Sequence, residues 1–290
     1  MIITSIGKAG KYQETSYILH GRKCSGCFST LAIAQLLDIP REDKILLLVT
    51  PQTVKASSDI QSQFKKAGYH NLETICIPRA EDEESIFQIV LTLTDAVAEG
   101  EQIILDVTHS FRSLPFVYFV TLLFLHAFKG VSIEGIYYGS FEEGRETNPV
   151  VDLTSLFSMV FWFYAVQTFR ETGSVQPLYD IARREASRII QRKEKEEIAY
   201  KLSALKVPLQ NLGLSISFCL PIEMGICVEQ LLQKLDFKSD KGSYEKLLAL
   251  VFQEISDELK EFALSSKKKD EILLTQEELM REYQIAQWYN

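Results

Sequence analysis

The sequence lacks a hydrophobic run long enough to cross a membrane. Its most apolar stretch, Leu114–Phe128, has about 15 residues, whereas a membrane-spanning helix needs roughly 20. The opening residues, MIITSIGKAGKY, show neither the basic leader nor the apolar core of a secretory signal. We therefore expect a cytoplasmic protein without a membrane partner, in which Leu114–Phe128 is a buried helix.

Cysteine and histidine are scarce. Five cysteines are an odd number, which favours a reduced cytoplasmic chain over a disulfide framework. Cys24 and Cys27 form a CxxC pair, but no second pair completes a zinc site, so isolated thiols, no metal and no cofactor are expected. The histidines all lie in the first half, which excludes an RxxxxH ribonuclease pair from the second: His20, His70, His109 and His126.

An excess of positive charge is also lacking. The formal net charge is -8, whereas proteins that hold long nucleic acids neutralise many phosphates with a basic surface. Direct binding of long nucleic acid by this chain is therefore not expected, although one local pocket can still take a small anion. Neither GxGxxG nor GxxxxGK[ST] occurs, so no dinucleotide or P-loop fingerprint is present.

The first half of the chain has the alternating pattern of an α/β domain. Runs rich in Ile, Val and Leu predict strands at Met1–Ile6, Lys44–Val49, Leu72–Ile77, Gln102–Asp106 and Ser132–Tyr138. Helical segments are predicted between them, at Ser29–Asp38, Gln52–Ala67, Glu83–Ala98 and Ser113–Phe128. This alternation favours a Rossmann-like, mostly parallel sheet covered by helices on both faces. Thr15–Cys24 breaks the alternation and predicts a hairpin.

The second half is all-helical by pattern. Helices are predicted at Thr154–Glu171, Val175–Leu205, Pro221–Leu235, Tyr244–Leu264 and Gln276–Tyr289. Pro149, beside a turn, is the expected boundary between a domain of residues 1–148 and a helical domain of residues 149–290.

Two features of the helical region leave alternatives open. The charged stretch Arg183–Lys201 favours a solvated helix with Ile189, Ile190 and Ile198 on a narrow stripe, and a dimer-facing helix is the alternative. The amphipathic segment Glu277–Asn290 is either a docked terminal helix or the point at which a truncated chain stops short of a further domain.

Ligands of open α/β sheets sit beyond the carboxyl ends of the strands, and polar residues follow several predicted strands here. Gly7–Lys11, GKAGK, combines glycines that permit close approach with two lysines, which suits an anion; a plain turn is the alternative. Thr50 follows the second strand and suits a helix N-cap as well as a ligand. Tyr138–Ser140 follows the last strand, and Gly139 leaves room there.

The residues after the fourth strand, Asp106–Ser113 (DVTHSFRS), carry the sharpest signal. Capping explains Asp106 and Ser113 but leaves His109 and Arg112 without a role. An arginine beside the free N–H groups of a helix start suits a phosphate. The junction therefore indicates an anion site.

The segment Asp106–Ser110, DVTHS, resembles the DxTHG motif of a group of CRISPR-associated proteins that carry a CARF domain. Tyr12, Thr15 and Tyr17 are similar to the YxxTxY arrangement of that family, and Asp152–Gly173 is similar to its following helical segment. Ser110 departs from the motif, because the family has glycine at that position.

The resemblance implies a homodimer whose two CARF domains share one pocket for a cyclic tetra- or hexa-adenylate, the second messenger of type III CRISPR antiviral defence. Binding would pass a shift through the helices to an effector outside this sequence. The implied ligand contacts are Gly7, Lys8, Ala9, Gly10, Tyr12, Thr15, Thr50, Thr108, His109, Ser110, Phe111, Arg112, Gly139 and Ser140. No catalytic residue is assigned.

Two other functions stay open. A self-limiting ring nuclease would open the ring without a metal, by attack of a ribose 2′-hydroxyl on the neighbouring phosphate. A transcription regulator or a plain nucleotide-binding protein is a third possibility, disfavoured because no helix-turn-helix or dinucleotide fingerprint is recognisable.

Overall fold

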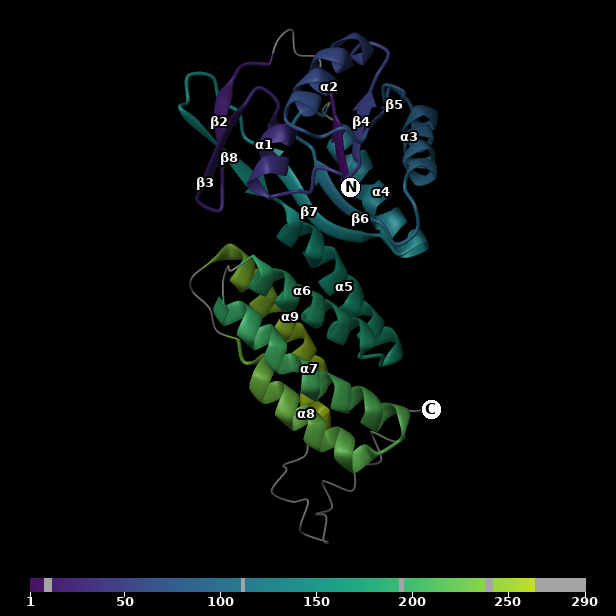
Figure 1. Ribbon diagram of the computed structural model, residues 1–290. Helices are drawn as coiled ribbons and strands as arrows, with labels where there is room; N and C mark the ends of the chain where they lie inside the picture. The colour runs from purple at the N-terminus through teal and green to yellow at the C-terminus, as the bar shows by residue number, and fades with distance from the viewer. Residues whose placement is uncertain (8–11, 111–112, 193–195, 238–241, 264–290) are drawn as a thin grey trace. The chain divides into compact units, whose positions relative to one another are not determined.

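The computed structural model describes residues 1–7, 12–110, 113–192, 196–237 and 242–263. The chain divides into two compact units, Met1–Thr154 and a second that begins at Ser155. The first is an α/β unit and the second is helical, as predicted (Figure 1). None of the helices within the described ranges is long and apolar enough to span a membrane.

A parallel sheet forms the centre of the first unit. Its strands match the predicted ones: β1 (Ile2–Ser5), β4 (Ile45–Val49), β5 (Leu72–Cys76), β6 (Gln102–Asp106) and β7 (Ser132–Gly139). They lie in the order β7-β6-β1-β4-β5, and every neighbouring pair is parallel. Their carboxyl ends therefore meet along one edge.

Helices cover both faces of this sheet, which is why its central strands β1 and β4 are buried on both sides. The covering helices are α1 (Ser29–Leu36), α2 (Ser57–Lys66, preceded by the short 3₁₀ helix η1, Val54–Ala56), α3 (Glu83–Ala96) and α4 (Leu114–Lys129). Ile2 and Ile6 of β1 pack with Phe64 of α2 in one core cluster. After β5 the chain reverses direction across the sheet, so right-handed crossovers place α3 and α4 on the opposite face (Figure 1).

The predicted hairpin is confirmed, but a further strand was missed. β2 (Thr15–Leu19) and β3 (Arg22–Gly26) are antiparallel, and β8 (Thr147–Asp152) lies between β2 and β7. Pro149, expected at a domain boundary, lies within β8, where its carbonyl accepts a hydrogen bond from Ser140 N at 2.9 Å. The first unit therefore runs to Thr154 rather than ending at residue 148.

The second unit is a bundle with a continuous apolar core. Its elements are α5 (Thr154–Thr172), α6 (Gln176–Gln191), α7 (Glu196–Ser217), α8 (Pro221–Leu235), α9 (Ser243–Leu259) and the 3₁₀ helix η2 (Lys260–Phe262). Trp162 of α5 and Phe252 of α9 meet edge to face in the core, with ring centroids 5.6 Å apart.

Two expectations about this unit were wrong. The single helix predicted over Val175–Leu205 is two helices, α6 and α7, because the chain turns after Gln191. Ile189 of α6 and Ile198 of α7 are core residues, whereas Ile190, the next residue along α6, lies on the outer side of that helix and is 59% exposed. The helix predicted at Gln276–Tyr289 lies outside the described residues.

Candidate functional site

The turn after β6 is organised around a buried carboxylate. Asp106 Oδ2 accepts hydrogen bonds from Ser29 Oγ at 3.0 Å and Thr30 Oγ1 at 2.5 Å, and Oδ1 accepts from the Thr108 N–H at 2.9 Å and from the Thr108 hydroxyl. Each carboxylate oxygen thus has two donors from the protein itself. Asp106 therefore positions the turn, in keeping with the capping role expected from the sequence.

Thr108 connects this turn to the end of the neighbouring strand β7. Its hydroxyl oxygen accepts a hydrogen bond from the Gly139 N–H at 2.7 Å. A Cβ atom at Gly139 would lie 3.1 Å from Tyr17 Cε1 and 3.3 Å from Thr108 Cγ2. The space left by the missing side chain of Gly139 is therefore filled by side chains of β2 and the β6 turn, which approach its backbone closely.

His109 faces the interior. Its ring stacks on Phe28, with centroids 4.7 Å apart and planes 14° apart, and meets Tyr12 edge to face, also at 4.7 Å. Its Nε2 atom is buried and has no hydrogen-bond partner within the described ranges. Burial lowers the pKa of His109, and the Asp106 charge only partly opposes this shift, so the ring is neutral at pH 7.

Gly7, at the end of β1, contacts the same histidine through the backbone. A Cβ atom at Gly7 would lie 2.7 Å from the His109 carbonyl oxygen, so the glycine allows β1 and the β6 turn to approach. Tyr12 OH donates to the Gly7 carbonyl at 3.2 Å. Gly7, the residue of the glycine turn that the structure describes, therefore packs against the β6 turn and is hydrogen-bonded to Tyr12.

A pocket of about 360 Å³ opens beside these residues. Of the predicted ligand contacts, Tyr12, Thr108, His109 and Gly139 line it. Sequence reasoning missed the other lining residues, which are Gln13, Tyr17, Cys27, Tyr138 and Phe141. Tyr17 and Tyr138 could have been predicted from the sequence, since Tyr17 belongs to the YxxTxY arrangement and Tyr138 to the segment Tyr138–Ser140 that follows the last strand.

The described lining of this pocket carries no Asp, Glu, Lys or Arg. Burial raises the pKa of Tyr12 to about 12, against a smaller opposing effect of its bond to Gly7. Burial, followed by the charge of Asp106, raises the pKa of Tyr17 to about 12. Both phenols therefore stay protonated at neutral pH.

Other predicted contacts make hydrogen bonds within the protein and do not line this pocket. Thr15 Oγ1 accepts from Asn148 Nδ2 at 2.7 Å, and Ser110 Oγ shares a hydrogen bond with Ser5 Oγ at 2.8 Å. Thr50 is buried, and its N–H donates to Thr53 Oγ1 at 2.9 Å. The N-cap role expected for Thr50 was wrong, because η1 begins after Thr53 and α2 begins after Ala56. The Ser140 N–H is used in the bond to Pro149 already described. Lys8, Ala9, Gly10, Phe111 and Arg112 lie outside the described residues.

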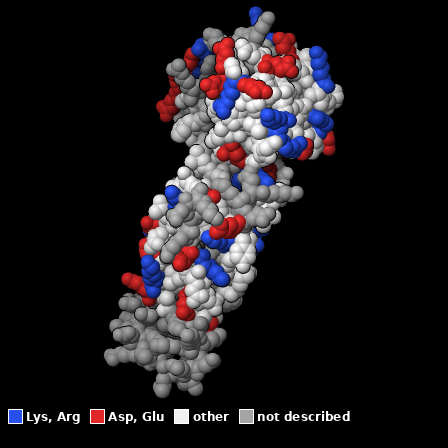
Figure 2. Space-filling model, turned by 90° about the vertical axis from the view of Figure 1, so that its left-hand side faces the viewer, with Lys and Arg blue, Asp and Glu red and all other residues white. Residues whose placement is uncertain are grey.

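The described residues hold no cluster of His, Cys, Asp and Glu that could bind a metal ion. Figure 2 shows Lys and Arg side chains interspersed with Asp and Glu on the face it presents, rather than gathered into a continuous basic surface. This distribution agrees with the net charge and suits a small ligand better than a long nucleic acid.

The sheet order and the pocket at its carboxyl edge define a Rossmann-like ligand-binding domain. Residues 1–142 match the family model of the CARF domain of CRISPR system endoribonuclease Csx1. CRISPR-associated protein MJ1674 of Methanocaldococcus jannaschii is 32% identical over 190 residues. The first unit is thus a CARF domain of the kind found in CRISPR-associated proteins. The match covers 63% of this chain but only 27% of the relative, so the chain spans a minor part of that protein.

Proposed function

We propose that the pocket binds the adenylate units of a cyclic oligoadenylate, the tetra- or hexa-adenylate ring of type III CRISPR signalling. The observation that carries this proposal is the pocket of about 360 Å³ at the carboxyl edge of the CARF sheet, with aromatic side chains around it. Tyr12 and Tyr17 come from the β1–β2 segment, and Tyr138 and Phe141 come from the end of β7 and the residues after it.

The lining suits a planar base with polar edges. Tyr138 and Phe141 are each almost half exposed, so their rings are available for stacking, and base–aromatic stacking contributes roughly 1–3 kcal/mol per base. The Gln13 amide can both donate and accept, as the edge of adenine requires. Phosphate charges would be met by Lys8 and Arg112, which remain predictions from the sequence.

The ring would be shared by two copies of the chain, and α4 offers a face for that contact. Phe116, Val120, Phe124 and Phe128 are exposed at every fourth position, and α3 packs beside α4 with Phe87 and Leu91 exposed as well. Together these side chains expose roughly 700 Å², close to the ~800 Å² that each partner buries in a standard interface. Because α4 begins just after the β6 turn, a two-fold contact here would bring two pockets near each other.

Replacing Phe116 and Phe124 together by Glu should weaken self-association at least 100-fold, because two charges would be buried against an apolar surface. Sedimentation equilibrium measures this directly. Phe163→Glu, at a comparably exposed position on α5 of the helical unit, is the control and should leave this contact intact. An unchanged association constant in the double variant would rule out this face.

We favour binding over cleavage. His109 is neutral, packed between aromatic rings, and its Nε2 atom is shielded from solvent, so it is poorly placed to move a proton. Any ring opening would depend on positioning the ribose 2′-hydroxyl alone, which supports a slow reaction. The family model is named for an endoribonuclease, but residues 127–290 contain no histidine, so an RxxxxH effector would have to be supplied by residues outside this sequence.

A thermal melt with cyclic tetra- and hexa-adenylate tests this function. A ligand at 100 times its Kd stabilises a protein by about 2.7 kcal/mol, which raises the melting temperature of the CARF unit by several degrees. Linear tetra-adenylate at the same concentration is the control and should give a smaller rise. No shift with either ring would contradict the proposal.

A further inference from the structure

Ser110 is the position at which this chain departs from the DxTHG motif, where glycine is usual. The sequence led us to expect a ligand contact from its side chain. In the structure Ser110 Oγ shares a hydrogen bond with Ser5 Oγ at 2.8 Å, and Ser110 does not belong to the described lining of the CARF pocket. A glycine at this position could not make that bond, so the bond is a feature of this chain and not of the motif.

The bond joins β1 to the β6 turn beyond the point where the two strands stop pairing. The parallel pairing of β1 with β6 ends at Asp106. Ser5, the last residue of β1, reaches past that end, and its hydroxyl meets the hydroxyl of Ser110. Two residues further on, the backbone of Gly7 lies close to the His109 carbonyl oxygen. The contact between β1 and the β6 turn therefore continues through side chains after the ladder of backbone hydrogen bonds has ended.

Both hydroxyls lie where losing a partner is unfavourable. Ser5 is only 3% exposed, and the Ser110 N–H is already used, since it donates to the Val107 carbonyl at 3.2 Å and closes the turn. Tyr118 of α4 is buried nearby: burial raises the pKa of its phenol, and an interaction with Ser5 opposes that shift. A buried hydroxyl without a partner costs free energy. The pair therefore favours one position of the turn against β1.

That position decides where part of the pocket lining lies. Thr108 and His109 come directly before Ser110, and both line the pocket. The Thr108 hydroxyl also accepts the Gly139 N–H at 2.7 Å, beside Tyr138 at the end of β7. A displacement of the turn would thus change the lining contributed by two strands.

We infer that Ser110 is a positioning residue of the pocket: through Ser5 it holds the β6 turn in the place that the ligand needs, and it does not contact the ligand itself. The identity of the ligand rests on the proposed function, whereas the effect of the bond on the turn does not. Without the bond, the turn occupies the binding-competent position for only a fraction of the time, and the apparent affinity falls by that fraction.

Binding kinetics of the full chain test this role. Ser5→Ala and Ser110→Ala should each lower the association rate constant of the tighter-binding ring, cyclic tetra- or hexa-adenylate, roughly three- to tenfold, the range expected for one hydrogen bond. The dissociation rate constant should stay within about twofold of wild type, since the ligand-bound turn is already in place. The double variant should be no weaker than the single ones, because both changes remove the same bond. Surface plasmon resonance measures both rate constants.

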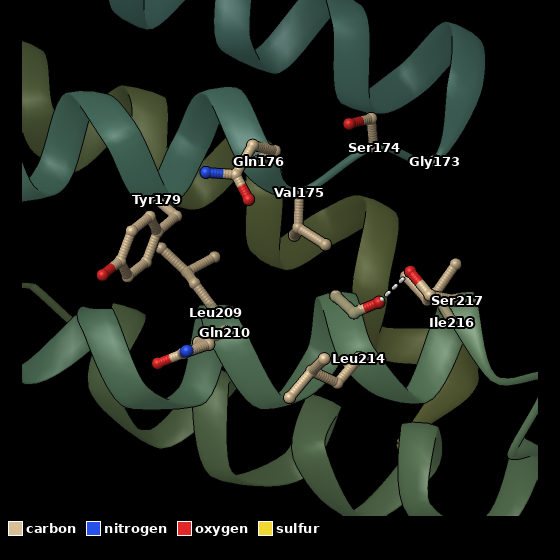
Figure 3. Close-up of a pocket in the computed structure, with 11 residues that line it drawn as sticks. Gly173, Ser174, Val175, Gln176, Tyr179, Leu209, Gln210, Leu214, Ile216 and Ser217 are labelled. Atoms are coloured by element: carbon tan, nitrogen blue, oxygen red, sulfur yellow. Dashed lines mark hydrogen bonds between the residues drawn. The ribbon is translucent and has the colours of Figure 1, made fainter.

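Ser217→Ala is the matched control. Ser217 lies beside a pocket of about 400 Å³ in the helical unit (Figure 3), and its hydroxyl donates to the Gly213 carbonyl at 2.8 Å, the same length as the Ser5–Ser110 bond. Its loss should leave both rate constants unchanged. Faster dissociation in Ser110→Ala, with Ser5→Ala like wild type, would show that Ser110 contacts the ring directly and would overturn the inference. Unchanged rates in both variants, or additive losses in the double variant, would also overturn it.

Hydrogen exchange tests the position of the turn without any ring. The Gly139 N–H, which is bonded to Thr108, should exchange at least about threefold faster in Ser5→Ala than in wild type or Ser217→Ala, as followed by NMR. Equal exchange rates would contradict the positioning role whether or not a ring binds. Faster exchange together with a wild type that binds neither ring would instead contradict the proposed function, and the role of Ser110 in ring binding would fall with it.

Discussion

At the scale of single residues, the site is held by groups that face inward. Asp106 collects four hydrogen bonds from Ser29, Thr30 and Thr108, and His109 lies between Phe28 and Tyr12. These residues set the positions of the pocket aromatics, which are the groups left for a ligand. The side chains of Asp106 and His109 therefore stabilise the fold of the turn.

Gly7→Ala should destabilise the first unit. The new methyl group would lie 2.7 Å from the His109 carbonyl oxygen, and the backbone on both sides would have to move. We expect a loss of about 1–3 kcal/mol in urea unfolding. Gly26→Ala is the control, since its nearest neighbour would be 3.9 Å away, and it should change stability by less than about 0.5 kcal/mol.

Equal stability of the Gly7 and Gly26 variants would mean that β1 and the β6 turn do not approach each other as described.

The buried histidine predicts a pH dependence of stability. Burial lowers the pKa of His109 in the folded state below its ordinary value near 6.5, so the unfolded chain binds the proton more readily. The stability that His109 contributes is therefore present above pH 6.5 and is lost as the pH falls below it. His109→Gln should give a flatter dependence than the wild type between pH 7 and pH 5, measured by urea unfolding. Parallel curves would contradict a buried neutral ring.

At the scale of elements, the helical unit contains a buried polar network that joins three helices. Glu185 of α6 is 1% exposed and accepts hydrogen bonds from Ser158 of α5 at 2.8 Å and from Tyr244 of α9 at 2.9 Å. Arg188 pairs with the same carboxylate at 2.8 Å. Burial, and then the Glu185 charge, raises the pKa of Tyr244, so its phenol remains a donor.

Glu185→Ala should cost about 3–5 kcal/mol of unfolding free energy, because it leaves the partly buried Arg188 and Tyr244 without their shared, buried acceptor. Glu254→Ala removes a partner of Arg170 from an exposed ion pair and should cost less than about 1 kcal/mol. Chemical denaturation compares the two. A similar small loss in both would show that the network does not hold α5, α6 and α9 together.

The sequence predicted most elements because their patterns are local. The apolar runs of β1 and β4 could be read directly, since both strands are buried along their whole length. β6 and β7 are partly buried and β5 lies at the sheet edge, but their Ile, Leu and Val residues still gave a strand signal. β8 was missed because Pro149 is a strand breaker in isolation. In the fold it pairs with Ile18 of β2 and lies just beyond the last residue of β8 that is in register with β7. The site was half predicted for the same reason: Thr108 and Gly139 belong to local motifs, whereas Cys27 and Phe141 reach the pocket only through the fold.

At the scale of the whole molecule, the protein combines a CARF unit with a helical unit, and each exposes large apolar side chains within the described ranges. The net charge of -8 and the mixed charges of Figure 2 disfavour a role in holding long nucleic acid. A small cyclic ligand shared by two chains is consistent with both features, because a two-fold ring presents the same groups to each CARF unit.

Calorimetric titration of the full chain with cyclic tetra- and hexa-adenylate tests the central claim most directly. We predict that one of the two rings binds with a stoichiometry of one ring per two chains. Tyr138→Ala should weaken this binding roughly 5- to 100-fold, because it removes one stacking surface. Absence of binding heat with both rings at several temperatures, or saturation at one ring per chain with Tyr138→Ala indistinguishable from wild type, would contradict a shared ring in the aromatic pocket.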